Sequence, residues 1–363
     1  MRIGFFGSSL VSSYWNGAAT YYRGLLKALA GLGHEITFYE PDAFERQQHR
    51  DMADPDWARV VVYPATPDGW QEAVSAAARS ADLLVKASGV GVFDAELDLA
   101  IAMSRSSRTL AVYWDVDAPA TLDAIAADPC HHLRGLIPRY DLVLTYGGGD
   151  PVVAAYREWG ARGCVPIYNA LDPQTHYPVM PKPEYLCDLS FLGNRLPDRE
   201  SRVEEFFLNP ASLLPERAFL LGGSGWDTKP RPANVRIRGH IGTGDHNAFF
   251  CSAFATLNIN RESMARYGFS PPTRIFEAAG TGTCLITDRW DGLEQFFEPE
   301  LELLPAADGS EVAERLKALT PKRARQIGAT ARAKALARHT YRHRAQQVSR
   351  VLDLMTSSRE AAE

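Results

Sequence analysis

The sequence alternates short apolar runs with helical stretches along most of its length. Residues 2–6 form the first apolar run, and residues 17–30 then space their apolar side chains as a helix does. The segment from Gly31 to Gly33 ends that helix, and residues 34–39 are expected to form the next strand. Strand, helix and strand in this order are the building block of a parallel sheet, so we expect an α/β protein.

The same alternation continues in two series. Between them, residues 169–183 are rich in proline and polar side chains and show no apolar period, which is typical of a linker between domains. We therefore expect an N-terminal domain at 1–172, a second domain at 184–337 and a closing helix at 338–363. The expected strands of the two series lie at 60–63, 83–85, 109–113 and 142–145, and at 186–192, 218–221 and 255–259.

A dinucleotide-binding unit is the obvious rival for the first segment, with Glu40 as the acid that binds ribose. Its fingerprint needs Gly-x-Gly-x-x-Gly between the strand and the helix. The early glycines are Gly4 and Gly7 alone, and Gly17 comes much later. The sequence therefore argues against NAD binding.

Composition excludes several classes of protein. A formal charge of −5 argues against general nucleic-acid binding, which favours a basic surface. No apolar run approaches the roughly 20 residues that span a bilayer, and the N-terminus lacks a signal-peptide pattern. Five widely spaced cysteines fit reduced thiols, so we expect a cytoplasmic protein. The run 130–132, Cys-His-His, is not expected to bind zinc, because three consecutive residues rarely converge on one ion.

The stretch from Ser270 to Asp288 carries the strongest functional signal. Two prolines end whatever precedes it, and Thr273 is expected to cap a short helix. Arg274 and Glu277 then share one helix face. A helix N-terminus with an arginine suits a diphosphate, and a carboxylate one turn later suits a ribose diol. From spacing alone, a capped surface helix with an incidental Arg274–Glu277 ion pair explains the pattern equally well.

This stretch, from Ser270 to Gly282, resembles the donor-site segment of GT-B glycosyltransferases, and most closely the branch with the CgeB-like spore-maturation proteins. The resemblance implies that Glu277 binds the ribose of a nucleotide sugar, and it places Ser270 in the donor site. Many relatives carry another glutamate eight positions earlier, where this chain has Phe269. That departure leaves the sugar contacts and the stereochemistry of transfer open.

Other segments carry the same resemblance. The stretch with Asn16 and Gly17 is similar to the first unit of GT-B enzymes, whose glycine loop lies at the cleft between domains. Residues 339–345 resemble the closing segment. The resemblance implies two Rossmann-like αβα domains that face each other across a cleft, with a C-terminal helix that crosses back to the first domain.

A second phosphate-binding loop is expected after the strand at 186–192. Backbone N–H groups near Asn194, with Arg195 and its partner Arg199, suit phosphate oxygens. The position mirrors the "Gly-Arg" loop of GT-B donor sites, and a turn with surface arginines is the alternative. A further glycine loop at 221–226, with Gly223, misses the serine-hydrolase elbow by its last residue and is expected to shape the base or phosphate pocket.

Asp115 and Asp117 follow a strand at the end where α/β proteins place ligands. Three interpretations compete: an Asp-x-Asp metal site as in GT-A glycosyltransferases, an acceptor-side base, and a helix cap. A diphosphate has a binding site that needs no metal ion, formed by the two glycine loops with Arg274 and Glu277. We therefore expect Asp117 to act as the catalytic base on the acceptor side, with Asp115 in support.

These observations predict a glycosyltransferase that uses a UDP- or GDP-sugar and needs no metal or other cofactor. The acceptor, a glycan, lipid, protein or small molecule, is unknown. Residues 317–350 contain many basic and no acidic side chains, which indicates a solvated helix or, as the alternative, weak contact with an anionic membrane surface. Two other functions remain open: a nucleotide-sugar or glycan binding or assembly protein without turnover, and a metal-dependent GT-A enzyme that uses Asp115 and Asp117.

Overall fold

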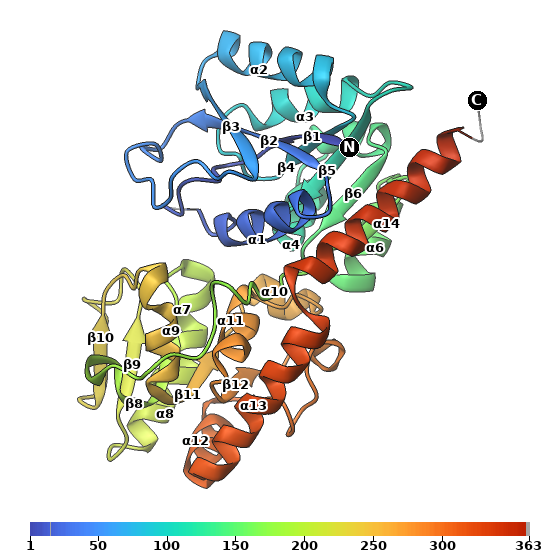
Figure 1. The fold of residues 1–363 in the computed structure, drawn as a ribbon. Helices are drawn as coiled ribbons and strands as arrows, with labels where there is room; N and C mark the ends of the chain where they lie inside the picture. The colour runs from blue at the N-terminus through green and yellow to red at the C-terminus, as the bar shows by residue number, and fades with distance from the viewer. Residues whose placement is uncertain (15, 361–363) are drawn as a thin grey trace. The chain divides into compact units, whose positions relative to one another are not determined.

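The computed structural model describes residues 1–14 and 16–360 (Figure 1). The chain divides into two compact units. Unit 1 contains Met1–Asn169 together with the C-terminal segment Tyr341–Glu363, and unit 2 contains Ala170–Thr340. The segment 170–183, expected as a linker, is thus part of unit 2. There Asn247 Nδ2 donates to Thr175 O over 2.9 Å, and Lys182 N donates to Ser252 Oγ over 2.8 Å.

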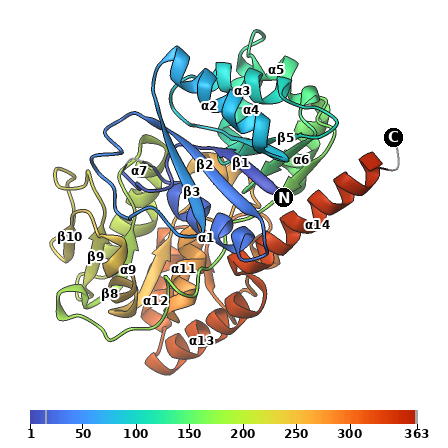
Figure 2. The ribbon, with the colours of Figure 1, turned by 45° about the horizontal axis from the view of Figure 1, so that its top comes forward.

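Unit 1 is built on a seven-stranded sheet in the order β3-β2-β1-β4-β5-β6-β7, and all its strand pairs are parallel. The central strands are buried on both faces, because helices cover both. Helices α1 and α14 lie on one face and α2 and α3 on the other (Figures 1 and 2). The strands are β1 Arg2–Phe6, β2 Glu35–Asp42, β3 Ala58–Pro64, β4 Leu83–Ala87, β5 Leu110–Asp115, β6 Leu142–Thr145 and β7 Cys164–Pro166; the helices are α1 Ala19–Ala30, α2 Pro67–Ser80, α3 Asp94–Met103, α4 Ala118–Ala127, α5 Leu133–Leu136, α6 Gly149–Glu158 and α14 Tyr341–Glu360.

Unit 2 is built on a six-stranded sheet in the order β10-β9-β8-β11-β12-β13, again with parallel pairs throughout. Helices α8 and α12 pack together, whereas α11 packs with α9 and α13. The strands are β8 Cys187–Leu192, β9 Phe219–Gly222, β10 Val235–Arg238, β11 Ala253–Asn258, β12 Leu285–Asp288 and β13 Leu304–Ala306; the helices are α7 Pro197–Val203, α8 Asn209–Leu213, α9 Thr243–Cys251, α10 Glu262–Tyr267, α11 Thr273–Thr281, α12 Gly309–Ala318 and α13 Pro321–Arg338.

The predicted return of the last helix to the first domain is confirmed. Helix α14 packs on α1, and Arg344 Nε donates to Tyr168 O over 3.2 Å. The preceding basic helix, α13, stays in unit 2 and packs on α11, with Ala324, Ile327 and Ala331 buried. Among the residues that the structure describes, no helix is both long and apolar enough to cross a membrane.

The contact between α1 and α14 depends on Gly24. A Cβ atom at this position would lie 2.2 Å from Cδ2 of Tyr341. We expect Gly24→Ala to lower the free energy of unfolding by about 1–3 kcal/mol, because overpacking outweighs the gain of alanine in a helix. Denaturant unfolding measures the change. Gly135→Ala is the control, since its Cβ would meet nothing within 4 Å; equal stabilities of the two variants would contradict the packing described.

Candidate functional site

The candidate site in unit 2 lies where the parallel strands end at their carboxyl edge. The loop 193–196 follows β8, the loop 223–226 follows β9, and Asn258 and Asp288 close β11 and β12. Open α/β sheets bind ligands at this edge. Asp288 Oδ2 accepts hydrogen bonds from Arg202 Nη2 over 2.6 Å and from Asn260 N over 3.0 Å. These bonds connect the end of β12 to the segment that follows β11.

Two arginines converge on Gly193. A Cβ atom at Gly193 would lie 3.1 Å from Nη1 of Arg199 and 3.1 Å from Nη2 of Arg274. Arg274 is held from two sides: its Nη1 donates to Asn258 Oδ1 over 3.1 Å, and its guanidinium lies 5.1 Å from the centroid of the Phe191 ring. Arg199 reaches the same place from α7, with Nη1 donating to Asn194 O over 3.3 Å.

Neither guanidinium forms an ion pair with an acidic residue in the described part of the chain. Arg199 Nε is buried and has no hydrogen-bond partner there. Burial and then the neighbouring charge of Arg274 lower the pKa of Arg199 to about 9, and burial lowers the pKa of Arg274 as well. Because the guanidinium group of arginine keeps its proton in proteins, both groups are cationic at neutral pH. Two such charges side by side are costly in isolation and suit a dianionic ligand.

The loops around this pair are held by contacts of their own. Arg195 binds Glu200 with two hydrogen bonds of 2.7 and 2.8 Å, so its charge is already matched. Asn194 Oδ1 accepts from Ser224 N over 3.0 Å and joins the two glycine loops. Gly223, at φ 126°, is required there, because an added Cβ would lie 2.3 Å from Gly193 O.

The start of α11 differs from the prediction in one respect. The helix begins at Thr273, and Pro272 occupies the N-cap without a side-chain bond. The predicted capping role of Thr273 is therefore wrong: this residue is already helical, so its hydroxyl does not reach over the first turn. Ser270 is buried and donates from Oγ to Gly268 O over 2.9 Å, which stabilises the turn before the helix.

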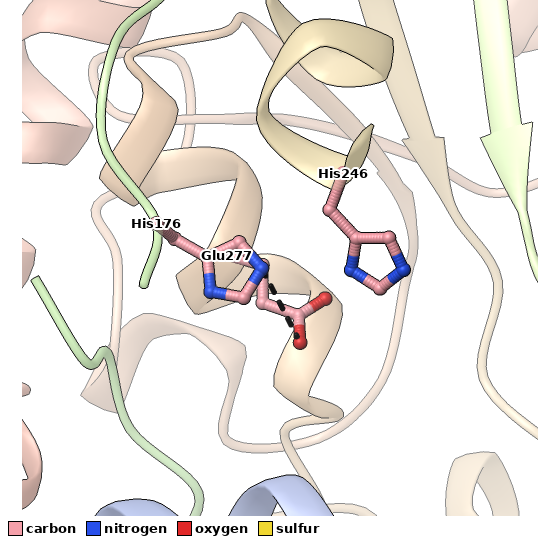
Figure 3. A group of neighbouring side chains, drawn as sticks. All are labelled: His176, His246 and Glu277. Carbon is pink, nitrogen blue, oxygen red and sulfur yellow. Dashed lines mark ion pairs between the residues drawn. The ribbon is translucent and has the colours of Figure 1, made fainter. Parts of the chain in front are cut away.

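Glu277 lies one turn into α11. It does not form the incidental ion pair with Arg274 that spacing alone allows, since Arg274 bonds Asn258. Its Oε1 instead lies 3.9 Å from Nε2 of His176, and His246 of α9 lies on the other side (Figure 3). No sequence motif predicts this group, because its three members are far apart along the chain.

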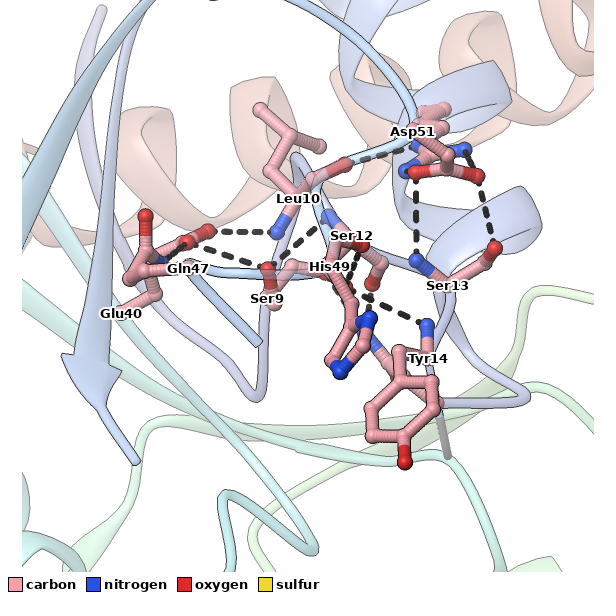
Figure 4. A network of polar contacts seen from close by, with 11 residues as sticks. Ser9, Leu10, Ser12, Ser13, Tyr14, Glu40, Gln47, His49 and Asp51 are labelled. Carbon is pink, nitrogen blue, oxygen red and sulfur yellow. Dashed lines mark hydrogen bonds and ion pairs between the residues drawn. The ribbon is translucent and has the colours of Figure 1, made fainter. Parts of the chain in front are cut away.

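In unit 1, the loop after β1 is held by hydrogen bonds to Glu40, which is fully buried (Figure 4). Glu40 Oε1 accepts from Ser9 Oγ over 3.0 Å, and Oε2 accepts from Leu10 N over 2.6 Å. Glu40 is thus occupied within its own chain, in line with the argument against NAD. Asn16 is also buried and donates to Ser9 O and Ser12 O, whereas Gly17 is exposed with open space around it.

Asp115 is a buried anchor. Its Oδ1 accepts from Ser88 Oγ over 2.8 Å, from Asp117 N over 2.9 Å and from Thr121 Oγ1 over 3.0 Å, and Tyr156 donates to Oδ2. Burial raises the pKa of Asp115. With both oxygens engaged inside the protein, Asp115 is poorly placed to share a metal ion with Asp117.

Asp117 occupies the N-cap position of α4. Its side chain is half-buried and makes no capping hydrogen bond there. The capping interpretation is therefore contradicted. The backbone of Asp117 is positioned by Asp115, whose Oδ1 accepts a hydrogen bond from Asp117 N.

Comparison with known proteins agrees with this architecture. Residues 199–350 match the family described as glycosyl transferase-like. The chain is similar to sucrose-phosphate synthase from Thermosynechococcus elongatus, with TM-score 0.71, 15% identity, and 99% and 100% of the two chains covered. It is also similar to HepE from Anabaena in complex with UDP-glucose, with TM-score 0.65, 15% identity, and coverage of 97% and 99%.

A glycosyltransferase from Rickettsia africae is similar as well, with TM-score 0.62, 11% identity and 98% of each chain covered. No curated protein sequence matches the chain. These likenesses confirm the predicted GT-B fold with its two parallel sheets. The predicted enzyme class, a glycosyltransferase, agrees with both the family match and the fold neighbours.

The unpaired charges give a stability test that needs no ligand. We expect Arg199→Met to raise the free energy of unfolding by about 1 kcal/mol, because it removes a buried charge beside Arg274 while keeping the apolar stem. Urea unfolding at neutral pH measures it. Arg195→Met is the matched control and should destabilise the protein, because it breaks the pair with Glu200. A clear loss of stability in Arg199→Met would mean that this charge is satisfied within the protein.

Proposed function

We propose that the protein transfers a sugar from a nucleoside-diphosphate sugar to an acceptor, and that unit 2 binds the donor. One observation carries the proposal: the guanidinium groups of Arg199 and Arg274 meet at Gly193, and among the described residues neither forms an ion pair, although Glu277 and Asp288 act on Arg274 from further away. A diphosphate supplies the missing negative charge. The family match at 199–350 includes both arginines, and HepE, of the same fold, was crystallised with UDP and UDP-glucose.

In this proposal, Arg199, Arg274 and the free N–H groups at the start of α11 neutralise the diphosphate as it leaves. Stabilisation of the leaving group by fixed positive charges removes the need for a metal at the phosphates. Glu277 accepts hydrogen bonds from the ribose of a UDP- or GDP-sugar. Asn194 and Gly223 shape the phosphate loops. We also propose that the chain belongs to the CgeB-like branch, because the stretch from Ser270 to Gly282 resembles that branch.

Unit 1 is proposed to supply the acceptor side. Asp117 would take the proton from the acceptor hydroxyl, while the new glycosidic bond forms and the diphosphate leaves. Asp115 acts through it, as a positioning residue: its Oδ1 accepts from the backbone N–H of Asp117. The proposed division is 1–172 for the acceptor, 184–337 for the donor, and 338–363 for the helix that returns to unit 1.

Phe269 supports a second candidate function, a nucleotide-sugar binding protein without turnover. Its backbone N–H donates to Asp291 O over 2.6 Å, and its ring lies where a Cβ of Gly292 would be, 2.1 Å from Cδ1. An aromatic ring thus occupies the position at which many relatives carry a glutamate. Slow hydrolysis of the donor without acceptor distinguishes the two, since an active transferase releases free sugar and a pure binder does not.

The donor site predicts a division between phosphate and ribose contacts. Arg274→Ala should weaken UDP or GDP by roughly ten- to hundredfold and leave the free nucleoside nearly unaffected, because the loss of a charge-assisted bond costs about 1.5–3 kcal/mol. Glu277→Gln should weaken nucleoside and nucleotide about equally. Calorimetry measures both. Arg195→Ala is the control with little effect; a loss of stability alone in the first two variants would contradict the donor site.

The acceptor side makes its own prediction. Asp117→Asn should lower kcat by about 10²–10⁴-fold, the usual contribution of a general base, with nucleotide affinity unchanged. Turnover of the parent should persist in EDTA. Asp123→Asn, an exposed aspartate on the same helix, is the matched control. Lost nucleotide affinity in Asp117→Asn together with chelator-sensitive turnover in the parent would place the donor in unit 1.

A further inference from the structure

Three side chains of unit 2 bring metal-ligating atoms together. His176 lies in the segment before β8, His246 on α9 and Glu277 on α11, and one ligand atom of each lies within 4.8 Å of the others. Figure 3 shows the three side chains directed toward one another from these separate elements. Within residues 1–14 and 16–360, no other group of three or more histidine, cysteine, aspartate or glutamate residues brings its ligand atoms together in this way.

His176 is the unusual member of the group. Its side chain is 3% exposed, and its Nε2 has no hydrogen-bond partner among the described residues. The carboxylate oxygen Glu277 Oε1 lies 3.9 Å from this Nε2, which is too far for a hydrogen bond. Buried polar atoms nearly always have a hydrogen-bond partner. An imidazole nitrogen that is directed at a carboxylate but does not reach it therefore points to an ion or molecule that binds between the two groups.

His246 is oriented as a metal-bound histidine is. Its Nε2 lies 3.3 Å from Ile241 O, and since a carbonyl only accepts, Nε2 carries the proton. The lone pair is then on Nδ1, which is buried, has no hydrogen-bond partner in the described chain, and faces Glu277 in Figure 3. Histidines that bind metals typically donate their other N–H to a carbonyl or carboxylate in this way.

We propose that His176 Nε2, His246 Nδ1 and the Glu277 carboxylate bind a divalent transition metal ion, with Zn²⁺ the best match. Two imidazoles and one carboxylate form a frequent zinc ligand set, and a fourth position stays open to water or another ligand. Metal–ligand bonds of about 2.0–2.2 Å require ligand atoms about 3.3 Å apart. The three ligand atoms lie within 4.8 Å of one another, so binding of the ion would draw them closer together by side-chain rotation.

This site shares Glu277 with the ribose contact that we propose, but its argument does not rest on the proposed function. The ion would give the buried His176 nitrogen its partner and tie the segment 170–183 to α9 and α11. Because the test uses the metal alone, without nucleotide, its failure would leave the sugar-transfer proposal untouched.

The experiment titrates the full chain, first stripped with a chelator and then exchanged into buffer, with Zn²⁺ in a calorimeter. We expect one ion per chain. Co²⁺ in place of Zn²⁺ should give the visible absorption of a four-coordinate site. His176→Gln, His246→Gln and Glu277→Gln should each weaken Zn²⁺ binding by at least about ten- to hundredfold, the loss that even outer partners of a metal ligand cause.

Two controls keep the assignment specific. His240→Gln changes an exposed histidine of unit 2, and His131→Gln changes the run at 130–132; neither should alter Zn²⁺ affinity. Melting in the presence of chelator shows whether each variant folds, and if His176→Gln does not, the half-buried His246 and Glu277 carry the test. No Zn²⁺ binding by the parent, binding that survives in the folded variants, or binding lost with either control would overturn the proposal.

Discussion

The burial of two neighbouring arginines is the constraint on which the candidate site of unit 2 depends. Arg199 and Arg274 lie against Gly193, among the described residues neither forms an ion pair, and burial works against the charge of each. Such an arrangement persists only when the surrounding structure is stable enough to impose it. Here Asn258 and the Phe191 ring hold one arginine, and Asp288 with Arg202 fastens the strand ends beneath. The sheet therefore maintains a pair of positive charges, to which the diphosphate that we propose would bind.

In unit 1 the buried charged groups are carboxylates, and in contrast to the arginines of unit 2 they are hydrogen-bonded to several donors. Glu40 accepts from the loop after β1, and Asp115 accepts from Ser88, Thr121 and the backbone of Asp117. A buried charge is tolerable when several donors surround it. These two residues consequently define loop shape at the carboxyl edge of the sheet, and any chemistry at this edge belongs to side chains that they position.

Much of the fold was predictable from the sequence, and less of the site was. Apolar runs such as 2–6 mark strands directly, since a strand buried on both faces must be apolar throughout. The helix at Arg274 and Glu277 was also predictable, but its cap was not, because Thr273 and Pro272 both fit the start of a helix. The resemblance to the "Gly-Arg" loop likewise favoured Arg195 as the phosphate ligand, with Arg199 as its partner. Only the structure shows that Glu200 matches the charge of Arg195 and that Arg199 has no such partner.

The group around Glu277 illustrates a further limit of sequence patterns. His176, His246 and Glu277 come from three elements that the chain visits at intervals of 70 and about 30 residues, so no local motif connects them. What joins them is topology: α9 and α11 pack together, and the segment 170–183 runs along α9. Glu277 consequently lies between a guanidinium one turn earlier and two imidazoles beside it. The carboxylate of Glu277 is therefore shared by the ribose contact and the metal site that we propose. An ion that draws this carboxylate toward His176 would also change its position relative to the ribose of a bound nucleotide.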